Sequence, residues 1–345
     1  MFKNCYNLKN IDFGNNFKTY NIFSMNELFY NCKNLITLDL SKFSTKNVEN
    51  MDSMFYGCER INELDLSNFQ TSVCNDMSDM FQDCLSLKSL NLRYFVTNNV
   101  YLMSGMFSNC ISLMSLDLSG FNTRNVYYMP NMFLNCQSLE SLNLSSFDTS
   151  KVYYMGNMFS NCKSLISLDL SGFNTRNVYD MFSMFSNCQS LKSLDLSTFD
   201  TKNVDDMNNM FSDCESLTSL NIINFDTRKV HDMDNMFSNC QSLISLDVSS
   251  FDTNHVHSMR NMFSNCQSLT SIDLSQFDTV NVNFFDNMLY SCPSLAYIDI
   301  SSFSTSLDEI DLSDFQSKAG VLKIKKDFLE KLKINPPEAW TIDII

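Results

Sequence analysis

The stretch NMFSNCQSLISLDVSSFDTNHVHSM, residues Asn235–Met259, is repeated almost letter for letter on both sides of itself. The 26 residues before it begin NMFSDCESLTSLN, and the 26 after it begin NMFSNCQSLTSID. A period of this length is typical of repeat proteins, in which a unit stacks on its neighbours because it cannot bury its apolar side chains alone. The sequence therefore predicts one continuous solenoid.

One cysteine per unit sets the register of the repeat. Cys5 precedes Cys32 by 27 residues, and Cys74 falls where other units have valine. Each in-register cysteine lies in an apolar stripe with methionine and phenylalanine, and the zinc-site spacing C-x₂₋₄-C is absent. We therefore expect buried, reduced thiols, which need no oxidising compartment. The eleven cysteines spaced by 26 are Cys32, Cys58, Cys84, Cys110, Cys136, Cys162, Cys188, Cys214, Cys240, Cys266 and Cys292.

Within one unit, Leu165–Cys188, the letters LxxLxL match the strand signature of a leucine-rich repeat. Leu168 and Leu170 share one strand face, and a turn containing F-D/N-T follows. The apolar residues from Val178 to Cys188 then recur at the spacing of a short α- or 3₁₀-helix. The expected fold is an α/β repeat solenoid, a curved right-handed leucine-rich-repeat-like coil. Its parallel strands would line the concave face and its short helices the convex face.

The letters MFSNCxSLxSLDLSxFDTxNVxxM closely resemble the 26-residue bacterial surface-protein repeat of the BspA-like leucine-rich-repeat family. The resemblance covers about residues 25–305. It implies a leucine-rich-repeat solenoid and a surface protein used in adhesion or host contact. It carries no catalytic residues that could be transferred to this chain, and we do not expect the first residues to act as the export signal of the usual secreted member.

Composition excludes several classes of function. The net charge of −15 over 345 residues disfavours binding to nucleic acid and to anionic membranes. No apolar run approaches the ~18 residues of a membrane-spanning helix, and the first residues do not form a signal peptide. We expect no catalytic residues, because neither a nucleophile–base pair nor a phosphate-binding loop is present, and no cofactor.

Four polar columns of the repeat, made of threonine, aspartate, histidine and asparagine, are candidates for a structural or a functional role. A threonine in every unit, Thr45 through Thr305, is expected to hold its own turn by a side-chain-to-backbone bond, with ice binding as a weaker alternative. An aspartate column, Asp39 through Asp299, is expected to be a solvated face, with weak cation binding as the alternative. His231 and His257 share a column, but a bare pair lacks the ligands of a zinc site. The asparagine before each cysteine is expected to adopt the left-handed conformation at a helix end.

The two ends of the chain depart from the repeat. We assign residues 1–31 to a divergent N-terminal repeat, 32–305 to the solenoid and 306–345 to a C-terminal cap, with a basic docking tail as the alternative. The cap is expected to contain a strand in VLKI and a helix in KKDFLEKLK. Because the chain begins inside a unit, an uncapped N-terminal coil is expected to be a surface for self-association.

The residues between the valine and the methionine of each unit vary in a pattern, and four successive units carry tyrosine there. With the flanking apolar residues pointing inward, these tyrosines should form an exposed aromatic patch that binds a protein or glycan partner. The alternative is that the rings only stack on one another as scaffold. The predicted binding residues are Tyr101, Tyr127, Tyr128, Tyr153, Tyr154 and Tyr179.

The expected function is that of a non-catalytic repeat protein that mediates protein–protein or surface adhesion contacts. The alternative is a structural protein that stacks end to end or onto a larger assembly, such as a cell-surface layer or a virus particle. Neither alternative needs a metal. A location at a cell or particle surface follows from the family resemblance alone.

Overall fold

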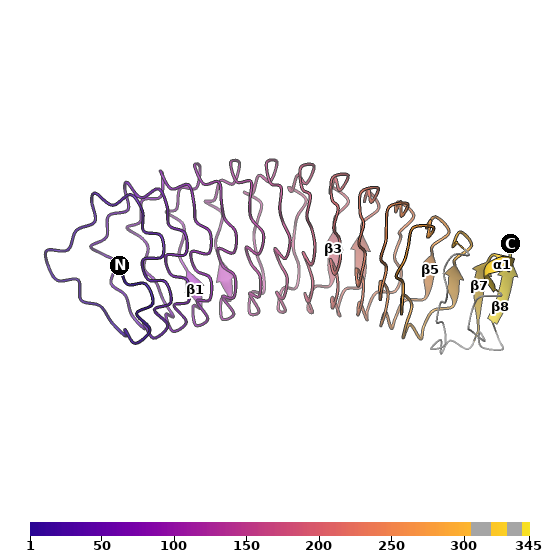
Figure 1. The fold of residues 1–345 in the computed structure, drawn as a ribbon. Coiled ribbons are helices and arrows are strands. Elements are labelled where there is room, and N and C mark those ends of the chain that lie inside the picture. The colour runs from indigo at the N-terminus through magenta and orange to yellow at the C-terminus, as the bar shows by residue number, and fades with distance from the viewer. Residues whose placement is uncertain (305–318, 330–339) are drawn as a thin grey trace. The chain divides into compact units, whose positions relative to one another are not determined.

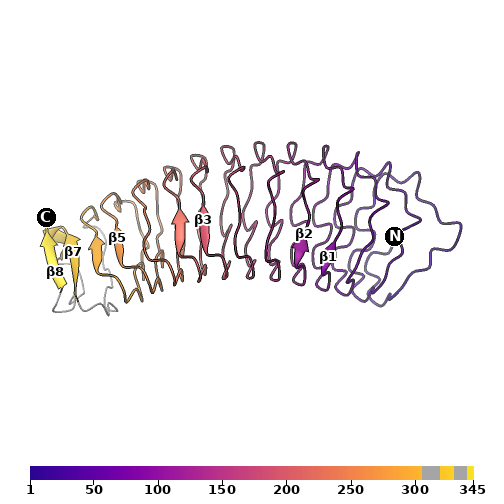
Figure 2. The same cartoon turned by 180° about the vertical axis from the view of Figure 1, so that it is seen from behind.

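The computed structural model describes residues 1–304, 319–329 and 340–345. The chain forms two compact units, Met1–Asn174 and Thr175–Ile345. In each unit the chain winds into successive coils that lie side by side, one coil for each repeat of the sequence (Figures 1 and 2). The predicted leucine-rich-repeat solenoid of parallel strands is confirmed. The assignment of residues 1–31, 32–305 and 306–345 to separate regions stays a prediction.

Short parallel strands mark the LxxLxL segment of the coils. In the first unit, β1 (Ser89–Leu90) pairs with β2 (Ser115–Leu116). In the second, β3 (Ser193–Asp195) pairs with β4 (Ser219–Asn221). Equivalent residues of successive coils face one another, Leu194 with Leu220 for example. One sheet of four strands has the order β5-β6-β7-β8, with β5 (Ser271–Asp273), β6 (Tyr297–Asp299), β7 (Gly320–Ile324) and β8 (Trp340–Ile344).

Within residues 1–304, 319–329 and 340–345, the helices expected opposite the strands do not form. Among the described residues, α1 (Lys326–Leu329) is the one helix. In the MFxNC segment the backbone bonds to the next coil instead, with the amide of Phe133 donating to the carbonyl of Met158 at 3.0 Å. Left-handed residues recur four positions apart in this segment, at Asn131 (φ 59°) and Asn135 (φ 60°), and make it a succession of turns. The left-handed conformation predicted for the asparagine before each cysteine is therefore confirmed, although it ends no helix.

The interior of each unit is a set of stacked apolar columns. In the first unit the rings of Phe55, Phe81, Phe107 and Phe133 are parallel, with centroids 5.7–5.8 Å apart. Leucine, methionine and valine columns lie beside them, and their side chains are buried as the repeat pattern predicted. Because each residue packs on its equivalent in the next coil, the core extends as far as the repeat does.

All the in-register cysteines are buried, as predicted, whereas Cys5 is half-buried. Their thiols donate to a carbonyl of the preceding coil, as Cys136 Sγ does to Phe107 O at 3.2 Å. Burial raises the pKa of Cys162 and of Cys214 to about 12. These thiols therefore stay protonated at neutral pH, which suppresses their reactivity.

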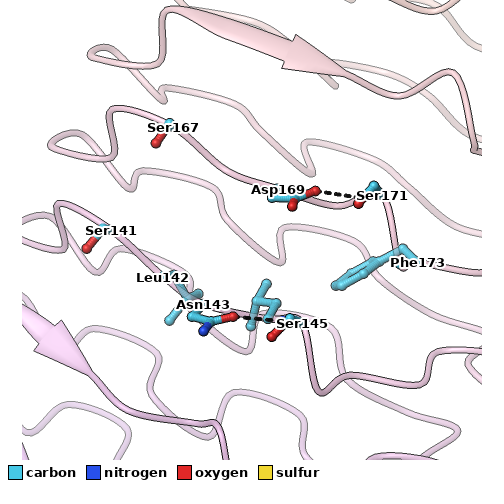
Figure 3. A pocket seen from close by; sticks show the side chains of 10 residues that line it. Ser141, Leu142, Asn143, Ser145, Ser167, Asp169, Ser171 and Phe173 are labelled. Carbon is cyan, nitrogen blue, oxygen red and sulfur yellow. Dashed lines mark hydrogen bonds between the residues drawn. The ribbon is translucent and has the colours of Figure 1, made fainter.

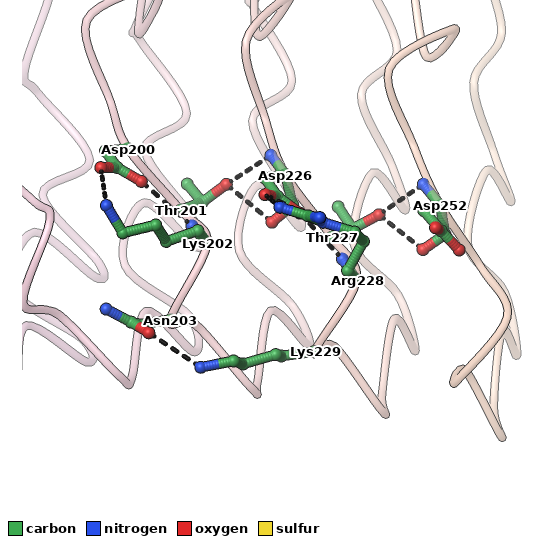
Figure 4. Close-up of polar contacts among 9 residues, drawn as sticks. All are labelled: Asp200, Thr201, Lys202, Asn203, Asp226, Thr227, Arg228, Lys229 and Asp252. Carbon is green, nitrogen blue, oxygen red and sulfur yellow. Dashed lines mark hydrogen bonds and ion pairs between the residues drawn. The ribbon is translucent and has the colours of Figure 1, made fainter.

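The threonine column was expected to hold its own turn. Its hydroxyls instead join each coil to the next (Figure 4). Thr201 Oγ1 donates to the carbonyl of Asp226 at 3.0 Å and accepts from the amide of the same residue at 2.7 Å. Thr227 makes the same two contacts with Asp252. One buried hydroxyl thus satisfies both backbone groups of a turn residue in the neighbouring coil.

The C-terminal residues continue the parallel sheet. β7 contains the VLKI stretch that was predicted as a strand, and it pairs with β6 on one side and with β8 on the other. α1 falls within the predicted helix, which Lys325 does not join and whose last residues, 330–333, lie outside the described part of the chain. Trp340 is buried, and Lys323 pairs with Asp299 at 3.4 Å. The role of residues 306–345 as a cap stays a prediction.

Removal of the Thr201 hydroxyl should destabilise the second unit. Thr201→Val keeps the side-chain shape but leaves the amide and carbonyl of Asp226 unsatisfied, at a cost of about 1–3 kcal/mol in the free energy of unfolding. Hydrogen exchange at the Asp226 amide should accelerate, and denaturant unfolding should begin earlier. Thr201→Ser keeps the hydroxyl and should restore most of the protection. Equal amide exchange in the valine and serine variants would contradict the role of the hydroxyl.

The buried thiols should resist labelling in the native state. At pH 8 an alkylating reagent should modify Cys5 first, and the in-register cysteines only as fast as the coils open. In denaturant all 13 cysteines should react. Mass spectrometry of the digested protein would reveal the order, and detection of disulfide-linked peptides in the native protein would refute the prediction of reduced thiols.

Candidate functional site

A second parallel ladder runs along the coils at the two residues between the valine and the methionine, here called the valine–methionine edge. Along it Leu102 pairs with Tyr128, and Tyr128 with Tyr154. The amide of Tyr127 donates to the carbonyl of Tyr101 at 3.1 Å. Because the flanking valines and methionines are buried, the two residues between them are left at the surface.

Five tyrosines of the first unit lie on this edge and form what we call the tyrosine patch: Tyr101, Tyr127, Tyr128, Tyr153 and Tyr154. Their exposed fractions lie between 37% and 44%, so each ring is partly packed and partly open to solvent. The Tyr101 and Tyr127 rings stack with centroids 6.2 Å apart, and the Tyr128 and Tyr154 rings meet edge to face at 5.2 Å. The structure therefore brings the predicted residues of this unit together at a partly exposed surface.

The sixth predicted residue, Tyr179, belongs to the second unit and is also exposed. Its carbonyl accepts the amide of Asp205 at 3.0 Å, so it occupies the same ladder position in its own unit. The tyrosine column ends there, because the following coils carry Asp205 and then His231. A binding role for all six residues stays a prediction.

In the first unit a carboxylate, Asp76, occupies the tyrosine column two coils before Tyr128. Asp76 pairs with Leu102 along the edge, and Asp52 and Asp79 lie close by. Burial, together with the charges of Asp52, Asp76 and Asp83, raises the pKa of Asp79 to about 6. The Asp79 carboxylate fills the space above Gly105, where a Cβ would clash with Asp79 Oδ1. Gly105 is also left-handed, with φ 57°, so both space and backbone require glycine there.

In the second unit the same column is acidic and then aromatic. Asp180, Asp206 and Asp232 pair in succession, and burial followed by mutual repulsion raises the pKa of Asp180 and Asp206. Farther along, Phe284 takes the position that Tyr128 and Tyr154 hold in the first unit. The Arg260 guanidinium lies over the Phe284 ring, 3.9 Å from its centroid.

A shallow hollow of about 450 Å³ opens on the strand face of the first unit (Figure 3). Asn143 and Asp169 line it, together with serines of two coils and Gly172. Asp169 Oδ1 accepts the amide of Ser171 at 3.0 Å, which lowers the pKa of Asp169. The aspartate column therefore has a structural role, since each exposed carboxylate closes a local turn.

Neither a metal centre nor a transmembrane helix is evident in the described ranges. Within residues 1–304, 319–329 and 340–345, no three histidine, cysteine or acidic side chains are placed to hold a metal ion. His231 and His257 do face each other, with ring centroids 5.8 Å apart. In the same ranges, every helix is too short or too polar to cross a bilayer.

Sequence reasoning missed two features of the valine–methionine edge. The half-buried carboxylates Asp52, Asp76 and Asp79 were not singled out, although an alignment of the repeats places Asp76 in the column of Tyr128. The stacking of Arg260 on Phe284 was also missed. Its signal is faint in the sequence, because the two residues lie 24 positions apart and meet only after the coils stack.

The comparison with protein families gives one match. A family model described as "Mycoplasma protein of unknown function, DUF285" matches residues 1–115, 83–193 and 213–328. The three matched segments together cover most of the chain. No curated protein matches it.

Solved structures of low similarity include three bacterial proteins. A leucine-rich repeat protein from Bacteroides ovatus ATCC 8483 is 17% identical, with 100% of this chain and 85% of that chain covered and a TM-score of 0.44. A leucine rich cell surface protein from Faecalibacterium prausnitzii A2-165 is 18% identical, with 83% and 71% covered and a TM-score of 0.38. An internalin from Listeria monocytogenes is 15% identical, with 79% and 75% covered and a TM-score of 0.23.

The raised pKa of Asp79 predicts that Asp79→Asn stabilises the first unit at neutral pH. Asparagine suits this position, because Asn131 occupies the equivalent left-handed site. The substitution should add about 1–2 kcal/mol to the free energy of unfolding at pH 7, allowing for the partial exposure of the group. The gain should be absent below about pH 4, where the carboxyl is protonated in both states, and should grow until about pH 6.

Denaturant unfolding from pH 3 to pH 8 measures this dependence. Asp65→Asn is the matched control, because hydrogen bonds from Ser67 lower the pKa of the exposed Asp65 and its loss should not stabilise the protein. A gain for Asp79→Asn that is independent of pH would contradict the electrostatic cause.

Proposed function

We propose that this chain, which belongs to the family described as "Mycoplasma protein of unknown function, DUF285", is a non-catalytic repeat protein that binds another protein through its tyrosine patch. The observation that carries the proposal is the gathering of five half-exposed tyrosine rings in two neighbouring columns of one unit. A contiguous exposed aromatic surface of this kind marks interaction sites more often than scattered aromatic residues do. Tyrosine contributes large contact area at a small entropic cost, which makes it a frequent anchor at interfaces.

The architecture supports binding better than scaffolding alone as the role of these rings. The backbone ladders, the phenylalanine stacks and the threonine hydroxyls already join each coil to its neighbour without the tyrosines. The edge also tolerates Leu102 and Asp76 at the position of Tyr128, so stacking of the coils does not require an aromatic ring there. The run of tyrosines is therefore not needed to hold the coils in register.

The proposal includes no catalytic step. Among the described residues the half-buried carboxylates Asp79 and Asp206 have pKa values raised by burial and by neighbouring acidic groups, and burial raises the pKa of the Cys162 and Cys214 thiols. Neither arrangement pairs a nucleophile with a base. A location at a cell surface and a role in adhesion are the finer part of the proposal, and they rest on the resemblance of the repeat to the BspA-like surface family.

Site-specific photo-crosslinking tests the proposed binding face. A benzoyl-phenylalanine in place of Tyr127 should give a discrete cross-linked product with a partner protein from the source cells. The same group in place of Tyr94, an exposed tyrosine of the same unit that lies off the patch, should not. Replacement of Tyr128, Tyr153 and Tyr154 by serine in the Tyr127 reporter should remove the product while circular dichroism shows an intact fold. Identical products from both reporter positions, or loss of the fold without a change in binding per folded molecule, would refute the proposal.

A further inference from the structure

Phe284 of the second unit occupies the repeat position that Tyr128 and Tyr154 hold in the first unit. An arginine of the same chain lies over its ring. Phe284 pairs with Ser258 along the valine–methionine edge, as Tyr154 pairs with Tyr128. The Phe284 ring is about half exposed, and its face carries the Arg260 guanidinium at 3.9 Å from the centroid. Attraction between a planar cation and the negative face of an aromatic ring stabilises this contact.

Carboxylates hold that guanidinium in place. Arg260 Nε lies 3.4 Å from Asp286 Oδ2, and Arg260 Nη1 lies 3.9 Å from Asp234 Oδ2. The backbone amide of Arg260 also donates to Asp234. The edge thus contains a complete cation site made of one aromatic face and two acidic neighbours.

The first unit has the rings without the cation. The residue that supplies the guanidinium lies 24 positions before the ring, and the corresponding residues are Ser104 for Tyr128 and Pro130 for Tyr154. Neither side chain can carry a positive charge. Among the described residues, no lysine or arginine lies over the ring of Tyr128 or Tyr154, whereas Lys3 lies over Tyr30 and Arg93 over Tyr94 elsewhere in the unit.

The nearest basic side chains in sequence are engaged elsewhere. Hydrogen bonds from Ser150, together with the charges of Arg124 and Lys151, lower the pKa of Asp148, so these charges act on the preceding turn. Lys151 Nζ also donates to Asn125 Oδ1 at 2.8 Å.

The charge at the N-terminal end of the patch is negative. Asp76 lies two coils from Tyr128 on the same ladder, which is ~10 Å at ~4.8 Å per coil. Asp52 and Asp79 lie next to Asp76, and their mutual repulsion contributes to the raised pKa of Asp79. A cation brought to this end of the edge would relieve that repulsion as well as pair with the carboxylates.

We propose that the partner places an arginine over the rings of Tyr128 and Tyr154 and a second basic residue near Asp76. The ligand class is therefore a basic, arginine-containing segment of another protein. In an extended segment, residues three positions apart span ~10 Å, which matches the separation of the two sites on the edge. This inference rests on the proposed function and adds the chemistry by which the tyrosine patch selects its partner.

A peptide titration tests the inference on the full chain. The probe is a capped glycine hexapeptide with two arginines three positions apart, and its control carries citrulline, an uncharged isostere, at both places. Binding is followed by NMR of ring-labelled tyrosines at 50 mM and 500 mM salt. The arginine peptide should bind at least threefold more tightly than the citrulline peptide at low salt, and high salt should weaken its binding.

Matched variants locate the site. Tyr128→Leu with Tyr154→Leu should weaken binding of the arginine peptide about threefold to tenfold, and the fold should tolerate leucine because Leu102 occupies this position in a neighbouring coil. Asp76→Asn should weaken it about twofold, because the substitution removes a negative charge from this end of the patch. The fold should tolerate asparagine, since Asn50 holds the equivalent position and accepts the same kind of turn amide as Asp76 does. Tyr94→Leu should leave binding unchanged, because the ring of Tyr94 is already covered by an arginine of the chain.

Several outcomes would overturn the inference. Equal binding of the arginine and citrulline peptides would exclude recognition of charge, and an equal loss in Tyr94→Leu would exclude the patch. Binding of maltohexaose in place of the arginine peptide, with the same dependence on Tyr128 and Tyr154, would assign the rings to a carbohydrate. Each of these results leaves the cross-linking result at Tyr127 unaffected, so the partner chemistry and the proposed binding function fail separately.

Discussion

Every coil of this protein depends on backbone hydrogen bonds that it cannot make by itself. In a helix the amides and carbonyls are satisfied within one segment, but here they are satisfied by the next coil, on the strand side, at the valine–methionine edge and in the MFxNC segment. The requirement that buried backbone groups be paired therefore forces equivalent residues of successive coils into register. Side chains follow the backbone, so each position of the repeat becomes a column. The core, the turns and the candidate binding edge are all columns of this kind.

This constraint explains which features of the fold the sequence predicts. Burial of Cys136, Phe133 and Leu139 follows from their recurrence at a fixed period, since a residue repeated in every coil either packs on its copies or faces solvent with them. The left-handed Asn135 follows from the preference of asparagine for that conformation. The exposure of Tyr127 and Tyr128 follows from their place between two inward-pointing residues.

The turns that replace the expected helices, and the threonine bonds between coils, could not be predicted in the same way. A spacing of three and four residues between apolar positions also fits a succession of turns with alternating left-handed residues, and only the partner of each amide separates the two structures. For Thr201 the sequence indicates a hydroxyl beside a turn, and both its own turn and the next one offer backbone groups. The contact of Arg260 with Phe284 also depends on how far a long side chain reaches across coils. Each of these features is decided by stacking, which no single unit encodes.

The threonine ladder has a consequence for how such a gene can change. Each hydroxyl binds both backbone groups of one residue in the next coil, the residue 25 positions farther along the chain. An inserted or deleted residue within a coil shifts its columns out of register unless a turn of that coil absorbs it, as in the 27-residue spacing of Cys5 and Cys32, whereas the gain or loss of 26 residues keeps every column in register. Unequal crossing-over between repeats is therefore tolerated more readily than small insertions. Such genes should differ in length between related strains by whole multiples of 78 nucleotides, since 26 codons encode one coil.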